Sequence, residues 1–448
     1  MLFAFGAPAV GAGYMYLLLA LYVMKFSTDV LLIAPAIMGL IFSVSRIWDA
    51  ISDPLVGYLS DRTTTSLGRR RTWILFSFVP IAIGFYAVFA PPVSLSGDAL
   101  TWWMAASIIG FYSAMTIFFV PHMALGAELS NDYHERSRLF GLRHAFYTVG
   151  SILSLGTMQL LLNEEFREGG DVRAMAEEYA LYAIIAMSVL VLYAVVNLRE
   201  RPEFQGRLNS SPTSAFRDVW QNPHARLLVI VTFIENVGSS AIAVLTLYVT
   251  QYVVGDPLSA PFIILAYMLP STASVPMWLP LSRRFGKIRV WMVGMALYGL
   301  AFGGMFFLPF LESVDARLTL IIVMAAFAGL AAGCGGTIGP SVQGDVIDYD
   351  EYKTGERKEG SYFAVWNFTY KSALGVMLLL TGFVLEASGF VPNQPQTMTV
   401  QIAMVSLYGA LPLLCYAIGV VLFSRFKLTE QEYSVIRAEL DRRAAATN

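Results

Sequence analysis

The chain has few charged residues and few residues suited to metal or redox chemistry. Of its 448 residues only 14% are charged, whereas 56% are hydrophobic. A soluble protein with so few charges could not cover its surface, so the composition predicts an integral membrane protein with many spans. The two cysteines, Cys334 and Cys415, lie in apolar runs without ligand spacing, which indicates core packing. The net charge of −2 gives no indication of a nucleic-acid partner.

Enzyme motifs are also missing from the sequence. Its four histidines form no HExxH motif and no paired-metal spacing, and there is no nucleophile elbow. A membrane enzyme is therefore the less favoured class, and no cofactor is expected. A channel or scramblase is a further alternative.

Long apolar runs dominate what remains. The N-terminal run has no charged n-region or clear cleavage site, so it is interpreted as the first span and not as a removable signal. Segments of roughly 20 apolar residues, the length that a bilayer requires, predict twelve transmembrane helices. They cover residues 5–27, 33–60, 73–91, 99–128, 139–163, 176–198, 224–253, 259–284, 288–309, 316–344, 360–388 and 399–424.

Basic residues are concentrated on one side of this predicted topology. The loops 61–72, 129–138, 199–226, 283–289 and 349–359 and the C-terminal tail hold 23 of the 30 basic residues. The opposite loops hold Arg167, Arg173 and Arg317. By the positive-inside rule, both termini are expected in the cytoplasm, in an inner or plasma membrane.

The chain also repeats itself. A Pro–Gly–acid segment closes both the fourth and the tenth predicted spans, and a basic loop with glycine follows both the second and the eighth. This predicts an all-α fold of two pseudo-symmetric six-helix bundles, an arrangement that secondary transporters use. The expected boundaries are 1–198 for the first bundle, 199–223 for a cytoplasmic linker, 224–425 for the second bundle and 426–448 for a cytoplasmic tail.

Two aspartates lie one helical turn apart inside the second span. Asp49 and Asp53 project from the same face of a helix, where a charge is costly and usually lines a binding cavity or an ion path. Neighbouring carboxylates resist joint ionisation, so the pair favours a bound cation or a proton. Ser52 offers a further oxygen ligand. A structural ion pair with Arg46 is the alternative interpretation.

Other polar residues in the spans suggest further roles. Lys371 in the eleventh span is interpreted as a counter-charge to the acid pair, and Lys25 is expected to extend to the membrane surface. Residues that close the cytoplasmic side by ion pairs between the halves, or that cap loops, are predicted to be Arg62, Glu128, Arg136, Asp345 and Asp348. Candidates for lining a substrate cavity are Arg143, His144, Glu235, Asn236, Tyr362 and Trp366.

Several of these segments together resemble a known family. The stretch Arg46-Ile-Trp-Asp49-Ala-Ile-Ser-Asp53-Pro-Leu-Val-Gly57 and the following Gly68-Arg-Arg-Arg are similar to the melibiose-permease family. These are glycoside–pentoside–hexuronide:cation symporters of the major facilitator superfamily. The segments Val120–Glu128 and Ile347–Arg357, with Lys371, match as well. The resemblance implies a major facilitator fold and a cation site at Asp49, Ser52, Asp53 and Thr116.

The sequence departs from the family pattern where sugar-binding members carry aspartates. Phe119 replaces one of them in the fourth span, and the start of the first span has no counterpart to the other. A buried hydroxyl-rich ligand would lose its best partners there. Gly6-Ala7-Pro8 and the acid motif are also similar to the animal lysophosphatidylcholine symporters, and Phe119 would suit an amphiphile.

The sequence thus predicts a cation-coupled symporter that works by alternating access. Na⁺ is the expected coupling ion and H⁺ the alternative. The expected substrate is a small, glycoside-like organic solute, with a lysophospholipid or another amphiphile as the alternative. We expect a monomer in the lipid bilayer.

Overall fold

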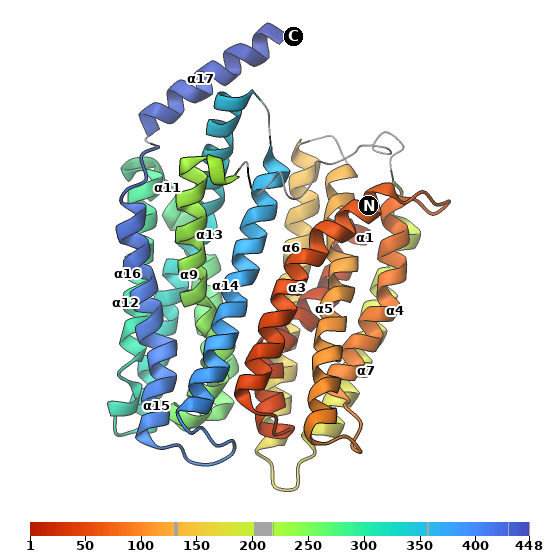
Figure 1. Cartoon of the computed structure of the whole chain (residues 1–448), viewed down its shortest axis with the longest axis vertical. Coiled ribbons are helices and arrows are strands. Elements are labelled where there is room, and N and C mark those ends of the chain that lie inside the picture. Colours follow the sequence, from red (N-terminus) through yellow and green to blue (C-terminus); the bar gives the residue numbers. More distant parts are fainter. Residues whose placement is uncertain (130–132, 201–216, 218, 356–357, 429, 448) are drawn as a thin grey trace. The chain divides into compact units, whose positions relative to one another are not determined.

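The chain is helical throughout the part that the computed structural model describes (Figure 1). The described part is the whole chain except residues 130–132, 201–216, 218, 356–357, 429 and 448. It divides into two compact units. Unit 1 comprises Met1–Asn209 and Leu378–Gln394, and unit 2 comprises Ser210–Met377 and Pro395–Asn448. Most of the predicted linker 199–223 lies outside the described residues, and the predicted domain boundaries stay a prediction.

Unit 1 is built from seven labelled α-helices and one π-helical turn. They are α1 (Leu2–Gly6), α2 (Pro8–Lys25), the π-helical turn Phe26–Val30, α3 (Pro35–Arg62), α4 (Arg69–Phe89), α5 (Gly97–Glu128), α6 (Tyr133–Glu165) and α7 (Val172–Asn197). Proline at the first position starts α2 and α3, because its fixed φ suits the first turn. The Glu200 carboxylate accepts the backbone N–H groups of residues 69–71 and so caps α4.

Unit 2 continues with the second set of helices. They are α9 (Pro223–Val249), α10 (Ala260–Ala273), α11 (Val275–Phe285), α12 (Lys287–Met305), α13 (Val314–Thr354), α14 (Glu359–Ala387), α15 (Met398–Val405), α16 (Leu411–Phe423) and α17 (Glu430–Thr447). The last residues of α14 belong to unit 1. Asn222 caps α9, where its side-chain oxygen accepts the N–H groups of His224 and Ala225.

The helices correspond to the predicted spans. Ten helical segments of the described part are long and apolar enough to cross a membrane, and α10 with α11 qualifies as one further span bent by 47°. The remaining predicted span is α3, which has 28 residues but carries Arg46 and Asp49 at its centre. These charges lower the mean hydropathy of α3, so length and composition alone do not identify it as a membrane span.

The same helix pairs pack in both units. In unit 1, α5 contacts α3 and α4, and α7 contacts α2 and α4. In unit 2, the matching helix α13 contacts α10 and α12, and α16 contacts α9 and α12. Each pair in one unit corresponds to a pair six spans later, which agrees with the internal repeat seen in the sequence.

Helices α2 and α6 approach each other through glycines. A Cβ atom on Gly13 would overlap the backbone carbonyl of Tyr147, and one on Gly150 would overlap that of Val10. Backbone contact of this kind needs residues without side chains, as in other membrane helix pairs. The contact brings the end of α6 beside the end of α2.

The prediction that Lys25 extends to the membrane surface is wrong. Its side chain is 1% exposed and forms ion pairs with Asp29, at 3.3 Å, and with Glu165 at the end of α6. Thr28 donates a hydrogen bond to Asp29. Burial between two carboxylates stabilises the ammonium group in place, so it has no need to reach water.

We predict that Lys25→Met destabilises unit 1. The substitution leaves two buried carboxylates without their cation, and breaking a buried pair costs about 3–5 kcal/mol. Thermal unfolding of the purified protein should show a clearly lower Tm. Arg289→Met, at an exposed arginine of α12 without an ion pair to a described residue, is the control and should leave Tm nearly unchanged. An unchanged Tm for Lys25→Met would show that the pairs contribute no stability.

Candidate functional site

The two acids of the second span meet at one hydroxyl group. The Thr116 Oγ1 atom, on α5, lies 2.8 Å from Asp49 Oδ1 and 2.9 Å from Asp53 Oδ1. The one-turn spacing on α3 therefore places both carboxylates toward α5, which the structure packs against α3. Three oxygen atoms from two helices converge at this point.

This group is nearly closed to solvent in unit 1. Asp49, Ser52 and Thr116 are buried, and Asp53 is half-buried. The Ser52 hydroxyl donates to the backbone carbonyl of Asp49, so its oxygen stays close to the acids. Pro54 follows Asp53 within α3 and lacks an N–H, so one backbone carbonyl of the preceding turn has no helical donor. Carboxylate, hydroxyl and carbonyl oxygens are the ligands that hard cations prefer.

Arg46 lies beside the acids, as the structural alternative predicted. Its Nη1 atom is 3.6 Å from Asp49 Oδ2 and donates to the Tyr16 hydroxyl at 3.2 Å, and its guanidinium covers the Tyr112 ring. Its Nε and Nη2 atoms are buried without a hydrogen-bond partner. The ion pair with Arg46 accounts for the position of Asp49, and the Thr116 hydroxyl joins Asp53 to the same group.

Phe119 and Arg143 lie next to this group. The Phe119 ring contacts Tyr16 edge to face, with ring centroids 5.8 Å apart, and the Arg143 guanidinium lies 5.8 Å from the Phe119 ring. Phe119 is half-buried, and the Nε atom of Arg143 is buried without a partner. His144 is exposed, and no contact joins it to Phe119 among the described residues. Arg143 is therefore the better placed of the two neighbours.

Glu235 and Asn236 lie on α9 in unit 2. Glu235 is buried, packs against Gly419 of α16, and makes no hydrogen bond or ion pair with a described residue. Asn236 donates to the backbone carbonyl of Thr232, so its side chain is used within its own helix. A buried carboxyl group without a partner is costly in apolar surroundings, which marks Glu235 as a functional candidate.

The aromatic candidates on α14 are buried within unit 2. Tyr362 is 0% exposed and accepts a hydrogen bond from Asn222 at 2.9 Å, and the ring of Trp366 lies beside it at a tilt of 59°. Their part in lining a substrate cavity stays a prediction. Lys371 is half-buried in unit 2, whereas the acid pair belongs to unit 1. Its opposition to the acids stays a prediction.

The residues predicted to close the cytoplasmic side pair within their own units. Glu128 accepts from Arg69 at 2.8 Å and from Arg70 at 3.3 Å, and Arg70 also pairs with Asp61. Arg62 is exposed and stacks on Tyr58 instead of contacting these acids. The side chain of Arg136 lies outside the described residues.

The two acids of α13 also bind neighbours in unit 2. Asp345 accepts from Lys287 at the start of α12, at 2.7 Å and 2.9 Å. Asp348 accepts from Tyr433 at 2.8 Å and pairs with Arg437 at 3.5 Å, both on α17. These contacts join α13 to α12 and α17 within unit 2. A role of the two acids between the halves stays a prediction.

Two groups of functional weight were missed by sequence reasoning. One is the pairing of Arg69 and Arg70 with Glu128 and Asp61 inside unit 1. The Gly68-Arg-Arg-Arg run indicated the orientation of the chain and a family resemblance, but not these partners. The other is the Tyr16–Arg46–Tyr112 arrangement. No local sequence pattern predicts this arrangement, because the three residues come from α2, α3 and α5.

Comparisons with known proteins identify relatives that match this chain over most of its length. The chain is 26% identical to the inner membrane symporter YicJ of Escherichia coli, covering 94% of this chain and 90% of that protein. It is 26% identical to the isoprimeverose transporter of Lactiplantibacillus pentosus, covering 100% and 92%, and 26% identical to the sodium-dependent lysophosphatidylcholine symporter 1 of Xenopus tropicalis, covering 92% and 84%.

Solved structures show the same fold. The crystal structure of a D-xylose–proton symporter aligns with a TM-score of 0.68 at 13% identity, covering 93% of this chain and 96% of that one. A family model described as MFS/sugar transport protein matches residues 4–430. The chain therefore belongs to the MFS/sugar transport protein family.

Proposed function

We propose that the protein is a Na⁺-coupled symporter that works by alternating access. The observation that carries the proposal is the meeting of Asp49 Oδ1 and Asp53 Oδ1 at the Thr116 hydroxyl. In this proposal the four oxygen-bearing side chains Asp49, Ser52, Asp53 and Thr116 bind the ion.

The charges around the acids fit a monovalent ion. On α3 the two carboxylates and the Arg46 guanidinium sum to one negative charge, and a single Na⁺ neutralises it. A divalent ion would leave a surplus positive charge in a buried place, which costs free energy. We further propose that Lys371 supplies a competing cation when Na⁺ is absent.

The substrate is proposed to bind beside Phe119. Its ring, Tyr16 and Arg143 offer two aromatic faces and a guanidinium group, which suit a sugar ring with an oxygen-rich substituent. We therefore propose a small glycoside-like solute. A lysophospholipid is the second candidate, because the missing aspartate at Phe119 leaves an apolar surface and one relative is named a lysophosphatidylcholine symporter.

A proton is the second candidate for the coupling ion. Glu235 favours it, because this buried carboxyl group has no cation beside it among the described residues. Tyr416 and Cys334 are the titratable groups that interact with it from α16 and α13. We also propose that both termini lie in the cytoplasm, on the side of the basic loops, and that the protein acts as a monomer.

We predict that Asp49→Asn and Asp53→Asn each abolish Na⁺-driven uptake. Each substitution keeps the shape of the side chain and removes the charge that holds the ion. Uptake into proteoliposomes under an inward Na⁺ gradient, with isoprimeverose as the first substrate to be tried, should fall at least about 100-fold, as expected when about 3 kcal/mol of ion binding is lost. Asp98→Asn, at an exposed position on α5, is the matched control and should transport normally.

Thr116→Val separates the ion site from the ion pair with Arg46. Valine removes the shared hydroxyl without changing any charge, so a purely structural role for the acids predicts normal Na⁺ dependence. The ion site predicts a higher Na⁺ concentration for half-maximal uptake. Normal Na⁺ dependence in all three variants would contradict the proposed function.

The substrate class is predicted to be revealed by Na⁺-dependent stabilisation. A ligand that binds the folded protein raises Tm by mass action, and a coupled ligand does so more strongly with Na⁺. Isoprimeverose and other glycosides should shift Tm in the presence of Na⁺, and Arg143→Gln should remove the shift. A Na⁺-dependent shift with lysophosphatidylcholine alone would favour the second candidate.

Glu235→Gln tests the coupling ion. If Na⁺ drives transport, this variant keeps the Na⁺ dependence of uptake and its response to external pH. If a proton on Glu235 drives transport, glutamine removes the stimulation of uptake by an inward proton gradient. Uptake at a fixed Na⁺ concentration and varied external pH distinguishes the two outcomes.

A further inference from the structure

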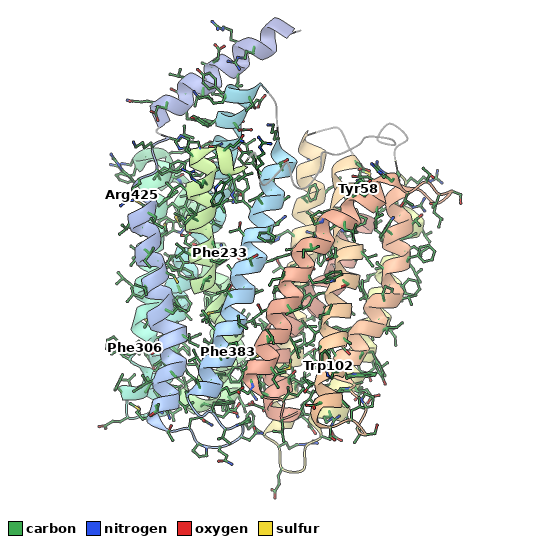
Figure 2. All side chains as sticks on the ribbon, in the orientation of Figure 1. Tyr58, Trp102, Phe233, Phe306, Phe383 and Arg425 are labelled. Atoms are coloured by element: carbon green, nitrogen blue, oxygen red, sulfur yellow. The ribbon has the colours of Figure 1, made fainter. Side chains whose placement is uncertain are left out.

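A cavity in unit 2 lies apart from every residue of the proposed transport site. Its volume is about 570 Å³, it is open on one side, and it is lined by the start of α9, the end of α13, Arg425, Lys427, Leu428 and α17. None of the candidate cation or substrate residues lines it. Figure 2 shows Arg425, one of its lining residues, between the end of α16 and the start of α17.

The wall formed by α17 is fixed in place. The Tyr433 hydroxyl and Arg437 bind Asp348, and Arg443 donates to the backbone carbonyl of Tyr352 at 3.1 Å. Burial and the neighbouring Asp348 carboxylate raise the pKa of Tyr433, so its hydroxyl remains a donor at neutral pH. Because these contacts tie both ends of the helix to α13, the cavity is a built feature of unit 2.

Unpaired positive charges gather in this cavity. Lys353, Arg425 and Lys427 line it, and none of them forms an ion pair with a described residue. Other basic residues of the same end are paired, such as Lys287 with Asp345 and Arg437 with Asp348. Glu432 is the one acid of the lining, and it faces His224. The cavity thus carries a surplus of positive charge.

The other walls of the cavity are apolar. Leu227 belongs to the second turn of α9, and Leu428 and Ile436 flank the turn into α17. Of the elements around the cavity, α9 and α13 are long and apolar enough to cross a membrane, and the cavity lies at the start of α9 and the end of α13. At the ends of such helices the hydrocarbon core gives way to the head-group region. A ligand that fits must combine an anionic group with adjoining hydrocarbon.

We propose that this cavity binds the phosphate head group of an anionic phospholipid from the leaflet on the basic-loop side. Lys353, Arg425 and Lys427 contact the phosphate oxygens, and the start of an acyl chain lies along Leu227 and Ile436. Basic pockets between helix ends on this side suit such head groups. A soluble phosphate compound shares the anionic part of this chemistry and lacks the acyl chain.

The test uses the full-length protein in nanodiscs of phosphatidylcholine with increasing phosphatidylglycerol. Phosphatidylglycerol should raise Tm of the wild type in a saturable way. Arg425→Gln with Lys427→Gln should need at least about tenfold more phosphatidylglycerol for the same shift, because each basic residue near the surface contributes about 1 kcal/mol to binding an anionic lipid.

The matched control is Arg283→Gln with Arg284→Gln. These arginines are exposed at the end of α11, carry the same total charge and do not line the cavity. The control should respond to phosphatidylglycerol like the wild type. Equal loss in both double variants would overturn the proposal, because it would show general attraction of the basic surface to the membrane.

Two further arms separate the remaining explanations. Glycerol 3-phosphate, added to nanodiscs of phosphatidylcholine alone, should leave Tm unchanged, and a saturable shift would overturn the lipid assignment in favour of a soluble ligand. Lys353→Gln is measured separately in case the double variant does not fold in phosphatidylcholine. It should weaken the response to phosphatidylglycerol, and a wild-type response would overturn the proposal.

Discussion

The structure of unit 1 depends on pairing charges that are buried between its helices. An isolated charge at that depth is too costly to keep, so each must have a partner or a ligand. Lys25 is balanced by Asp29 and Glu165 at one end of the unit, and Arg69 and Arg70 by Asp61 and Glu128 at the other. Between them, Arg46 forms an ion pair with Asp49, and the Thr116 hydroxyl joins Asp49 to Asp53.

The two units pack the same pairs of helices but differ in the polar side chains that lie between these helices. Unit 1 places ionised groups between its helices. At the core of unit 2 is a tyrosine cluster, in which Tyr267 and Tyr298 share a hydrogen bond and Tyr416 packs on Tyr298. Glu235, which has no hydrogen bond or ion pair to a described residue, lies beside this cluster. The repeated fold thus has unequal polar contents in its two halves.

Sequence patterns were sufficient for the helices and for the face that carries the acids. Hydropathy placed the spans, and the one-turn spacing of Asp49 and Asp53 placed both carboxylates toward one neighbour, because these are local properties of a chain. The partners could not be predicted in the same way. Glu165 lies 140 residues from Lys25, and Asn222 lies 140 residues from Tyr362. A local pattern carries no information on contacts that packing alone creates, so Lys25 was placed at the membrane surface and the hydrogen bond between Asn222 and Tyr362 was not predicted. Thr116 was indicated by family resemblance alone.

The glycine contacts between α2 and α6 limit how this protein can vary. Gly13 and Gly150 place one backbone directly on another, so neither position can accept a side chain without separating the helices. Tyr14 and Tyr16, next to these contacts on α2, still have side chains that can change. Substitutions that change substrate specificity can therefore occur at residues beside the helix contact, whereas the two glycines of the contact cannot be replaced. A library of variants aimed at new specificity would retain more folded members if it left the two glycines untouched.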